Sequence, residues 1–188
     1  SGGQGVRRFE GRPQRAVAMA RKRERLDFSH VSEIDWAKLA AFIDGEGHIQ
    51  IAMCKHRGNK QGRGEYEYVN LAIFNTDPRL HEWLTARFGG KVYVQNRGKS
   101  DLARARQHLW KPAFRWNVAC IHACELLERV RPHMVLKGEQ VDIALALQRT
   151  KRMWGVKGTP AGVIEERTQL RSQLKVLTAR GTGRILGK

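Results

Sequence analysis

The chain has 188 residues, which is enough for one domain with a sizeable core and a tail. Its 35 Lys and Arg outnumber its 18 Asp and Glu, so the formal net charge is +17 and nucleic acid is the first candidate partner. No apolar run reaches the roughly 18 residues of a membrane-spanning helix. The first residues also lack the apolar core of a signal peptide. We therefore expect no membrane association, no secretion and no dedicated protein partner.

The cysteines are few and odd in number: Cys54, Cys120 and Cys124. Such a set is typical of an intracellular, reducing compartment, here the cytoplasm or nucleoid of a prokaryote or phage-infected cell, or an organelle. Cys120, His122 and Cys124 suggest a zinc site, but the spacing is not C-x-x-C and a fourth ligand is missing. We interpret them as packing residues at a strand-to-helix junction.

The chain divides by composition into three parts. Residues 1–31 are rich in Arg and Lys and poor in apolar anchors, so they form either a solvated extension or an arm that lies along phosphates. Residues 32–150 carry alternating and helical apolar patterns and form the core. Residues 151–188 contain a C-terminal helix, which begins after Thr159-Pro160, and a basic tail.

The first predicted helix begins near Glu33, because Ser32 and Asp35 fit a capping box. It is apolar, rich in small residues, and ends in two glycines that bracket Glu46. The C-terminal end of a helix disfavours an anion. A residue placed against its local preference is a candidate for function, so Glu46 is the first candidate site residue.

Residues 39–47 read LAAFIDGEG and resemble the LAGLIDADG motif of homing endonucleases. Ala41 departs from the motif, since the family's usual first glycine is replaced there. The resemblance implies that this helix packs against its twin from a second repeat or subunit. It also implies that Glu46 binds a divalent metal at the scissile phosphate, with the Gly47 carbonyl as a backbone ligand.

The elements that follow alternate in a fixed order. Two strands at 48–55 and 66–75 precede a helix that starts at Thr76-Asp77-Pro78 and ends at Gly89-Gly90. Two further strands at 91–97 and from Phe114, and a helix at 121–130, complete an αββαββα order. This α+β order is that of one LAGLIDADG repeat. We expect a curved, four-stranded antiparallel DNA-binding sheet with helices on one face, plus C-terminal helices.

The other face of the sheet would lie in the DNA major groove, where Asn and Gln pair with adenine and Arg pairs with guanine. Simple solvent exposure would explain any one of these polar side chains, but it explains the whole set less well. The predicted DNA-binding residues are His48, Gln50, Lys55, Arg57, Tyr68, Asn70, Gln95, Arg97, Lys99, Arg115 and Asn117.

Phosphodiester hydrolysis needs an activated water and charge compensation, which Mg²⁺ supplies through carboxylate and carbonyl ligands; Mn²⁺ or Ca²⁺ would substitute for binding. Lys137 holds the position at the start of the helix through 141–147 where the family carries an active-site lysine, although it also reads as an ordinary basic residue. Asp77 matches a polar catalytic position near the end of the second strand, but a plain helix cap explains it equally well.

The motif occurs once in the sequence, whereas cleavage of a duplex takes two active sites. An isologous homodimer provides both and implies pseudo-palindromic half-sites. The predicted dimer interface comprises Ala40, Ala41, Ile43, Asp44 and Gly45.

The resemblance thus implies a site-specific, Mg²⁺-dependent homing endonuclease. As a homodimer it would break both strands of a long double-stranded DNA target and leave short 3′ overhangs, as in intron homing. The alternative is a non-cleaving binder of the same fold, either an intron RNA-splicing maturase or a DNA-binding regulator. A basic structural protein does not explain an acid between two glycines.

Overall fold

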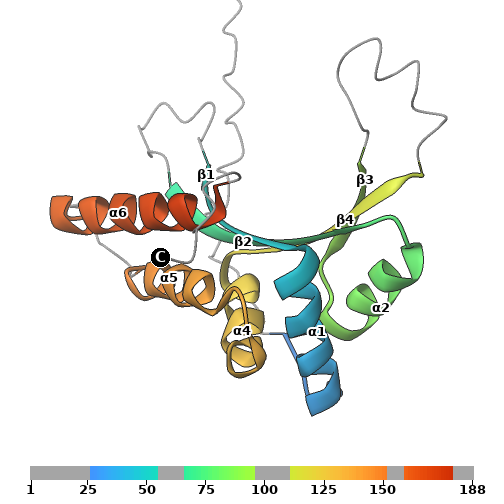
Figure 1. The fold of residues 1–188 in the computed structure, drawn as a ribbon. Coiled ribbons are helices and arrows are strands. Elements are labelled where there is room, and N and C mark those ends of the chain that lie inside the picture. Colours follow the sequence, from blue (N-terminus) through green and yellow to red (C-terminus); the bar gives the residue numbers. More distant parts are fainter. Residues whose placement is uncertain (1–25, 55–65, 96–110, 152–158, 180–188) are drawn as a thin grey trace, which may run out of the picture.

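A computed structural model describes residues 26–54, 66–95, 111–151 and 159–179. The described elements follow the predicted order (Figure 1). They are α1 (Glu33–Glu46), β1 (Gly47–Cys54), β2 (Tyr66–Asn75), α2 (Pro78–Phe88), β3 (Lys91–Gln95), β4 (Ala113–Ala119), α4 (Cys120–Val130), the 3₁₀ turn η2 (Arg131–His133), α5 (Gly138–Arg149) and α6 (Ala161–Thr178). The predicted α+β class and αββαββα order are therefore confirmed.

The four strands form one antiparallel sheet in the order β1-β2-β4-β3. In Figure 1 the helices α1, α2, α4 and α5 lie on one side of this sheet. The last described helix, α6, packs against α5 and against β1, which is one of the two edge strands. The side of the sheet opposite the helices is called the outer face below.

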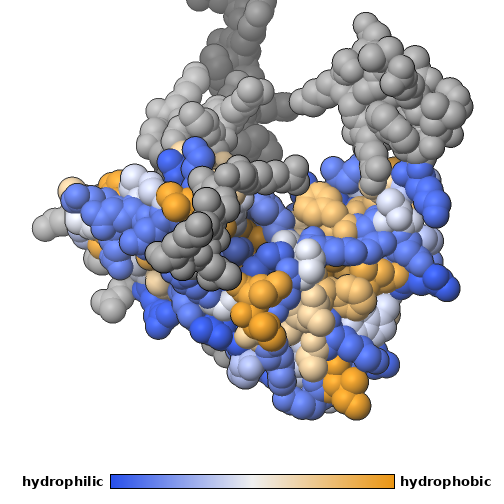
Figure 2. Space-filling model, viewed as in Figure 1, coloured by the Kyte–Doolittle hydropathy of each residue, from blue (hydrophilic) through white to orange (hydrophobic). Residues whose placement is uncertain are grey.

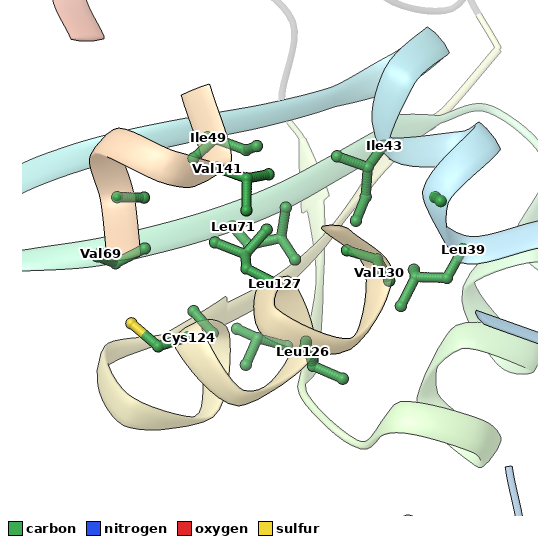
Figure 3. Close-up of a cluster of buried hydrophobic side chains, with 14 of the residues drawn as sticks. Leu39, Ile43, Ile49, Val69, Leu71, Cys124, Leu126, Leu127, Val130 and Val141 are labelled. Carbon is green, nitrogen blue, oxygen red and sulfur yellow. The ribbon is translucent and has the colours of Figure 1, made fainter. Parts of the chain in front are cut away.

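The core lies between the sheet and the helices (Figure 3). Ile49 of β1 and Leu71 of β2 are completely buried against Leu39 and Ile43 of α1 and Leu127 of α4. Ile49 and Leu71 lie directly opposite each other in the β1–β2 pair, on the face of the sheet that the helices cover. Each such side chain contributes roughly 1.5–3 kcal/mol of transfer free energy, and together they fix α1 on the sheet.

The capping box predicted at the start of α1 is present. The Ser32 hydroxyl accepts a hydrogen bond from the Asp35 N–H at 3.2 Å, and the Asp35 carboxylate accepts one from the Ser32 N–H at 3.3 Å. These bonds pair two backbone donors that the first turn of a helix leaves without helical partners.

At its other end, α1 passes directly into β1 at Gly47, which is extended with φ −78° and ψ 151°. A Cβ atom on Gly47 would lie 2.6 Å from both the Cα and the carbonyl oxygen of Ile43. Glycine is thus required by this close approach and not by an unusual φ angle. Because no residues separate the two elements, the position of Glu46 is set by both of them.

Within the described residues, no helix combines the length and apolar character needed to span a bilayer.

Candidate active site at the end of helix α1

Glu46 is the last residue of α1, and its side chain is exposed beside the end of β2. The Asn75 side-chain amide donates a hydrogen bond to Glu46 Oε2 at 2.5 Å. Asn75 Oδ1 in turn accepts the Asp77 N–H at 2.8 Å, and that bond orients the amide so that its NH₂ group faces Glu46. Asn75 therefore holds one oxygen of the carboxylate, and the other oxygen has no hydrogen-bond partner among the described residues.

Sequence reasoning missed Asn75. The register of the β1–β2 pair places Gly47 opposite Ile73, so the residue two positions beyond Ile73 lies alongside the last turn of α1. Pairing the two predicted strands in this register is enough to place Asn75 beside the end of the first helix. By residue type alone, the titratable Asp77 is the stronger catalytic candidate at the end of β2.

Lys137 reaches the same junction from the start of α5. Its ammonium donates hydrogen bonds to the carbonyl oxygens of Ile43 and Gly47, both at 2.7 Å. A cation at a helix C-terminus is favoured by the macrodipole and by the carbonyls of the last turn. Burial lowers the pKa of Lys137, and the nearby Asp44 carboxylate opposes this effect.

Asp44 anchors the segment that carries Lys137. Its Oδ2 accepts the Val135 N–H at 2.7 Å and its Oδ1 accepts the Lys137 N–H at 2.9 Å. Asp44 is a predicted dimer-interface residue, and within the protomer its carboxylate accepts these bonds from residues 91 and 93 positions away in the same chain. It ties α5 to α1 and thereby fixes where the Lys137 ammonium lies.

Asp77 is satisfied locally. It caps α2, where its Oδ1 accepts the Arg79 N–H at 2.9 Å, and it pairs with the Arg79 guanidinium at 2.6 Å. The Arg79 bonds lower the pKa of Asp77 to about 2. Its carboxylate is directed at Arg79, and its link to Glu46 runs through its backbone N–H and Asn75.

The residues predicted for the dimer interface lie on two sides of α1. Ala40 and Ile43 are completely buried in the core of their own protomer. Ala41 and Gly45 are exposed, and a Cβ on Gly45 would meet nothing within 4 Å. Figure 2 shows weakly polar and apolar surface over α1 in the centre of this view.

The predicted DNA-binding residues that the structure describes lie mainly on the outer face. His48 is exposed and Gln50 half-buried, whereas Asn70, opposite Gln50, is only 6% exposed. Arg115 stacks 5.4 Å over the Tyr93 ring and donates a hydrogen bond to Asn117 at 2.9 Å. Tyr68 and Gln95 are half-buried. The remaining predicted contacts, Lys55, Arg57, Arg97 and Lys99, lie outside the described residues.

Within the described residues, no three His, Cys, Asp or Glu side chains gather to hold a metal ion. The oxygen ligands at the junction are the Glu46 carboxylate and the Gly47 carbonyl, and both are of the hard type that Mg²⁺ prefers. Lys137 occupies one of the two lone pairs of the Gly47 carbonyl. The donor set therefore fits a divalent cation that takes its remaining ligands from water and phosphate.

No protein-family model and no curated protein matches the sequence. Among solved structures, the homing endonuclease I-CvuI in complex with its target aligns with a TM-score of 0.58 and 19% identity, over 80% of this chain and 85% of that chain. An archaeal intron-encoded homing endonuclease, I-Vdi141I, complexed with DNA, aligns with a TM-score of 0.58 and 12% identity, over 79% and 86%. The I-SmaMI LAGLIDADG homing endonuclease bound to cleaved DNA aligns with a TM-score of 0.57 and 16% identity, over 77% and 45%.

At identities this low, the structural alignments show a shared fold. Each of these three structures is a homing endonuclease. The chain therefore has the fold of the LAGLIDADG homing endonucleases, the family that its motif resembles.

Proposed function

We propose that the protein is a site-specific homing endonuclease that hydrolyses both strands of a long, pseudo-palindromic DNA target as a homodimer. Mg²⁺ would be required, and the products would carry short 3′ overhangs. The observation that carries the proposal is the position of Glu46 at the end of α1. Its exposed carboxylate is oriented by Asn75, and the Lys137 ammonium is fixed at the adjacent Gly47 carbonyl.

The residues at this junction suit the chemistry of phosphodiester hydrolysis. Glu46 and the Gly47 carbonyl would hold Mg²⁺, which when bound supplies an activated water and compensates charge on the phosphate. Lys137 places a positive charge where negative charge develops on the phosphate oxygens. Asn75 keeps the carboxylate in one orientation, so less ordering is needed when the substrate binds.

The dimer is supported by the exposed surface of α1 and by the neighbouring segment. Small side chains at Ala41 and Gly45 would let two helix backbones approach closely. Val135 and Leu136, beside Asp44, are 85% and 74% exposed, which is unusual for aliphatic side chains in a protomer that works alone. The I-SmaMI alignment covers 45% of that chain, so one copy of this chain corresponds to about half of that protein.

The proposal is tested with a plasmid library that carries randomised sites, incubated with Mg²⁺ and either the wild type or Glu46→Gln. We expect the wild type to linearise specific library members, and the recovered ends to give the target and its overhangs. Glu46→Gln should bind the recovered target but cut at least about 10²–10³-fold more slowly, the loss typical of one charge-stabilising group.

Two outcomes would contradict the proposal. Equal cutting by both proteins would remove Glu46 from the chemistry. Binding without cutting by either protein would favour the non-cleaving maturase or regulator.

A further inference from the structure

A hollow of about 480 Å³ lies between α6 and the edge strand β1. Its walls include Arg171, Ser172 and Lys175 from α6, and His48 and Gln50 from β1. All its polar lining groups are neutral or cationic, because no Asp or Glu is among the residues that line it. We call this hollow the α6–β1 groove.

The groove lies along β1, the strand that follows the candidate active site in the chain. Helix α6 runs antiparallel to β1: Arg171 Nη1 lies 3.5 Å from the Met53 sulfur, and Leu174, 2% exposed, packs in the groove with Ile51. The groove end formed by His48 is therefore two residues from Glu46. The basic face of α6 therefore lies beside the strand that begins directly after the end of α1.

The charges on α6 are arranged against the stability of the helix. Arg167, Arg171 and Lys175 follow one another at intervals of four residues, so they stack on one face, where like charges repel. Arg167 is used structurally, since its guanidinium donates to the hydroxyl and carbonyl of Thr150. In the described part of the chain, Arg171 and Lys175 have no carboxylate within salt-bridge distance.

We propose that the α6–β1 groove binds the phosphodiester backbone of the target DNA on the stretch that flanks the cut. Arg171 and Lys175, which no described carboxylate pairs with, match a run of phosphates better than they match a neutral or cationic ligand. The Ser172 hydroxyl donates to the Thr168 carbonyl within α6, so the two charged side chains carry the recognition. The groove is continuous with the outer face through His48 and Gln50, so DNA rather than a separate small anion is its occupant. The inference rests on the proposed function and adds a DNA-backbone site on α6 to it.

The test uses the full-length chain and a 30-base-pair duplex of mixed sequence, with Ca²⁺ in place of Mg²⁺, and fluorescence anisotropy over a range of salt concentrations. Arg171→Gln/Lys175→Gln keeps most of each aliphatic stem and removes both charges. Each phosphate contact contributes about 0.9 to the slope of log affinity against log salt, so the double variant should lose about 2 from the slope. Arg149→Gln, an exposed charge in the last turn of α5, is the matched control and should leave the slope within error of the wild type.

A second variant separates charge from shape. Arg171→Lys/Lys175→Arg keeps both charges and should restore the wild-type slope. If the double Gln variant is folded by circular dichroism and retains the wild-type slope, the groove does not bind phosphates, while the nuclease proposal stands. If the wild type itself shows no DNA binding, both proposals fall. Tighter binding of a 30-nucleotide RNA with the same loss in the double variant would overturn the assignment to DNA.

Discussion

Two junctions between a helix and a strand meet at the candidate site, and the carboxylates at the two junctions have different hydrogen-bond partners. At the β2–α2 junction, Asp77 is paired within two residues: it caps α2 and binds Arg79. At the α1–β1 junction, Asp44 is paired with backbone N–H groups 91 and 93 residues away, and Glu46 receives one hydrogen bond from Asn75. Both junctions hold carboxylates, but their chemical availability differs.

The difference separates structural acids from the candidate catalytic acid. A carboxylate whose oxygens are all engaged by the fold has little capacity left for a ligand. Asp44 and Asp77 are of this kind, whereas one oxygen of the exposed Glu46 carboxylate has no partner in the part of the chain that the structure describes. The comparison predicts that changes at Glu46 and its direct neighbours reduce cleavage, whereas changes at Asp77 reduce stability.

The largest effect after that of Glu46→Gln should come from Lys137. Lys137→Met removes the charge beside Gly47 and should slow cleavage of the recovered target about 10²–10³-fold. Lys151 is the matched control, because burial also lowers its pKa but it lies among Cys120, Cys124 and Glu67. Lys151→Met should retain most of the cleavage rate. Equal losses in the two variants would show that the effect comes from burial and not from the active site.

The next prediction compares Asn75 with Asp77 at the end of β2. Asn75→Ala leaves Glu46 without its orienting amide, and we expect a loss in cleavage rate of about 10–100-fold, as for other groups that orient a metal ligand. Asp77→Asn should change the rate less than threefold, because the cap is retained and the carboxylate does not reach Glu46. Single-turnover cleavage measures both. The reverse ranking would restore Asp77 as a catalytic residue.

Alanine substitutions at the two glycines of the motif should have different effects. Gly47→Ala places a Cβ 2.6 Å from the Ile43 backbone and should lower the free energy of unfolding by about 1–3 kcal/mol, the usual cost of overpacking. Gly45→Ala meets open space in the protomer, so it should leave the monomer folded and weaken association with a second copy. Urea unfolding and sedimentation separate these effects. A stable dimer of Gly45→Ala would contradict helix pairing along α1.

The smallest effect concerns the pH dependence at Asp77. Its pKa is lowered to about 2 in the folded state, below the ordinary value of 3.8, so folding favours the ionised form. The stabilisation is therefore present above about pH 4 and is lost as the pH falls toward 2. The difference in Tm between the wild type and Asp77→Asn should be constant near neutral pH and shrink below pH 4. A constant difference down to pH 3 would show that the ion pair with Arg79 adds no stability.

The order of the elements was predictable because caps, glycines and alternating apolar residues are local signals. Ser32 indicates the start of α1 and Gly47 its end, and the alternation around Leu71 indicates the buried face of β2. The contacts of Lys137 with Ile43 and Gly47 were not predictable, because they join segments 94 and 90 residues apart and depend on how α5 packs.

The sequence also did not predict which residues of α1 are buried in the protomer and which are exposed. Ala40, Ala41 and Gly45 are all small residues. Only the packing of α1 against the sheet shows that Ala40 is buried and Ala41 is exposed. The side chain of Asp44 has a comparable ambiguity, since a carboxylate near a helix end binds a partner helix or its own chain equally well. In the protomer this carboxylate accepts hydrogen bonds from the N–H groups of Val135 and Lys137.

The central claim is that the open oxygen of Glu46 shares a cation with DNA. The most direct measurement is a crystal structure of the dimer bound to its recovered target with Ca²⁺. We predict a cation about 2.3–2.6 Å from the Glu46 carboxylate, the Gly47 carbonyl and a phosphate oxygen at each cut position. Glu46 side chains directed away from the duplex, or a cation bound without them, would contradict the account.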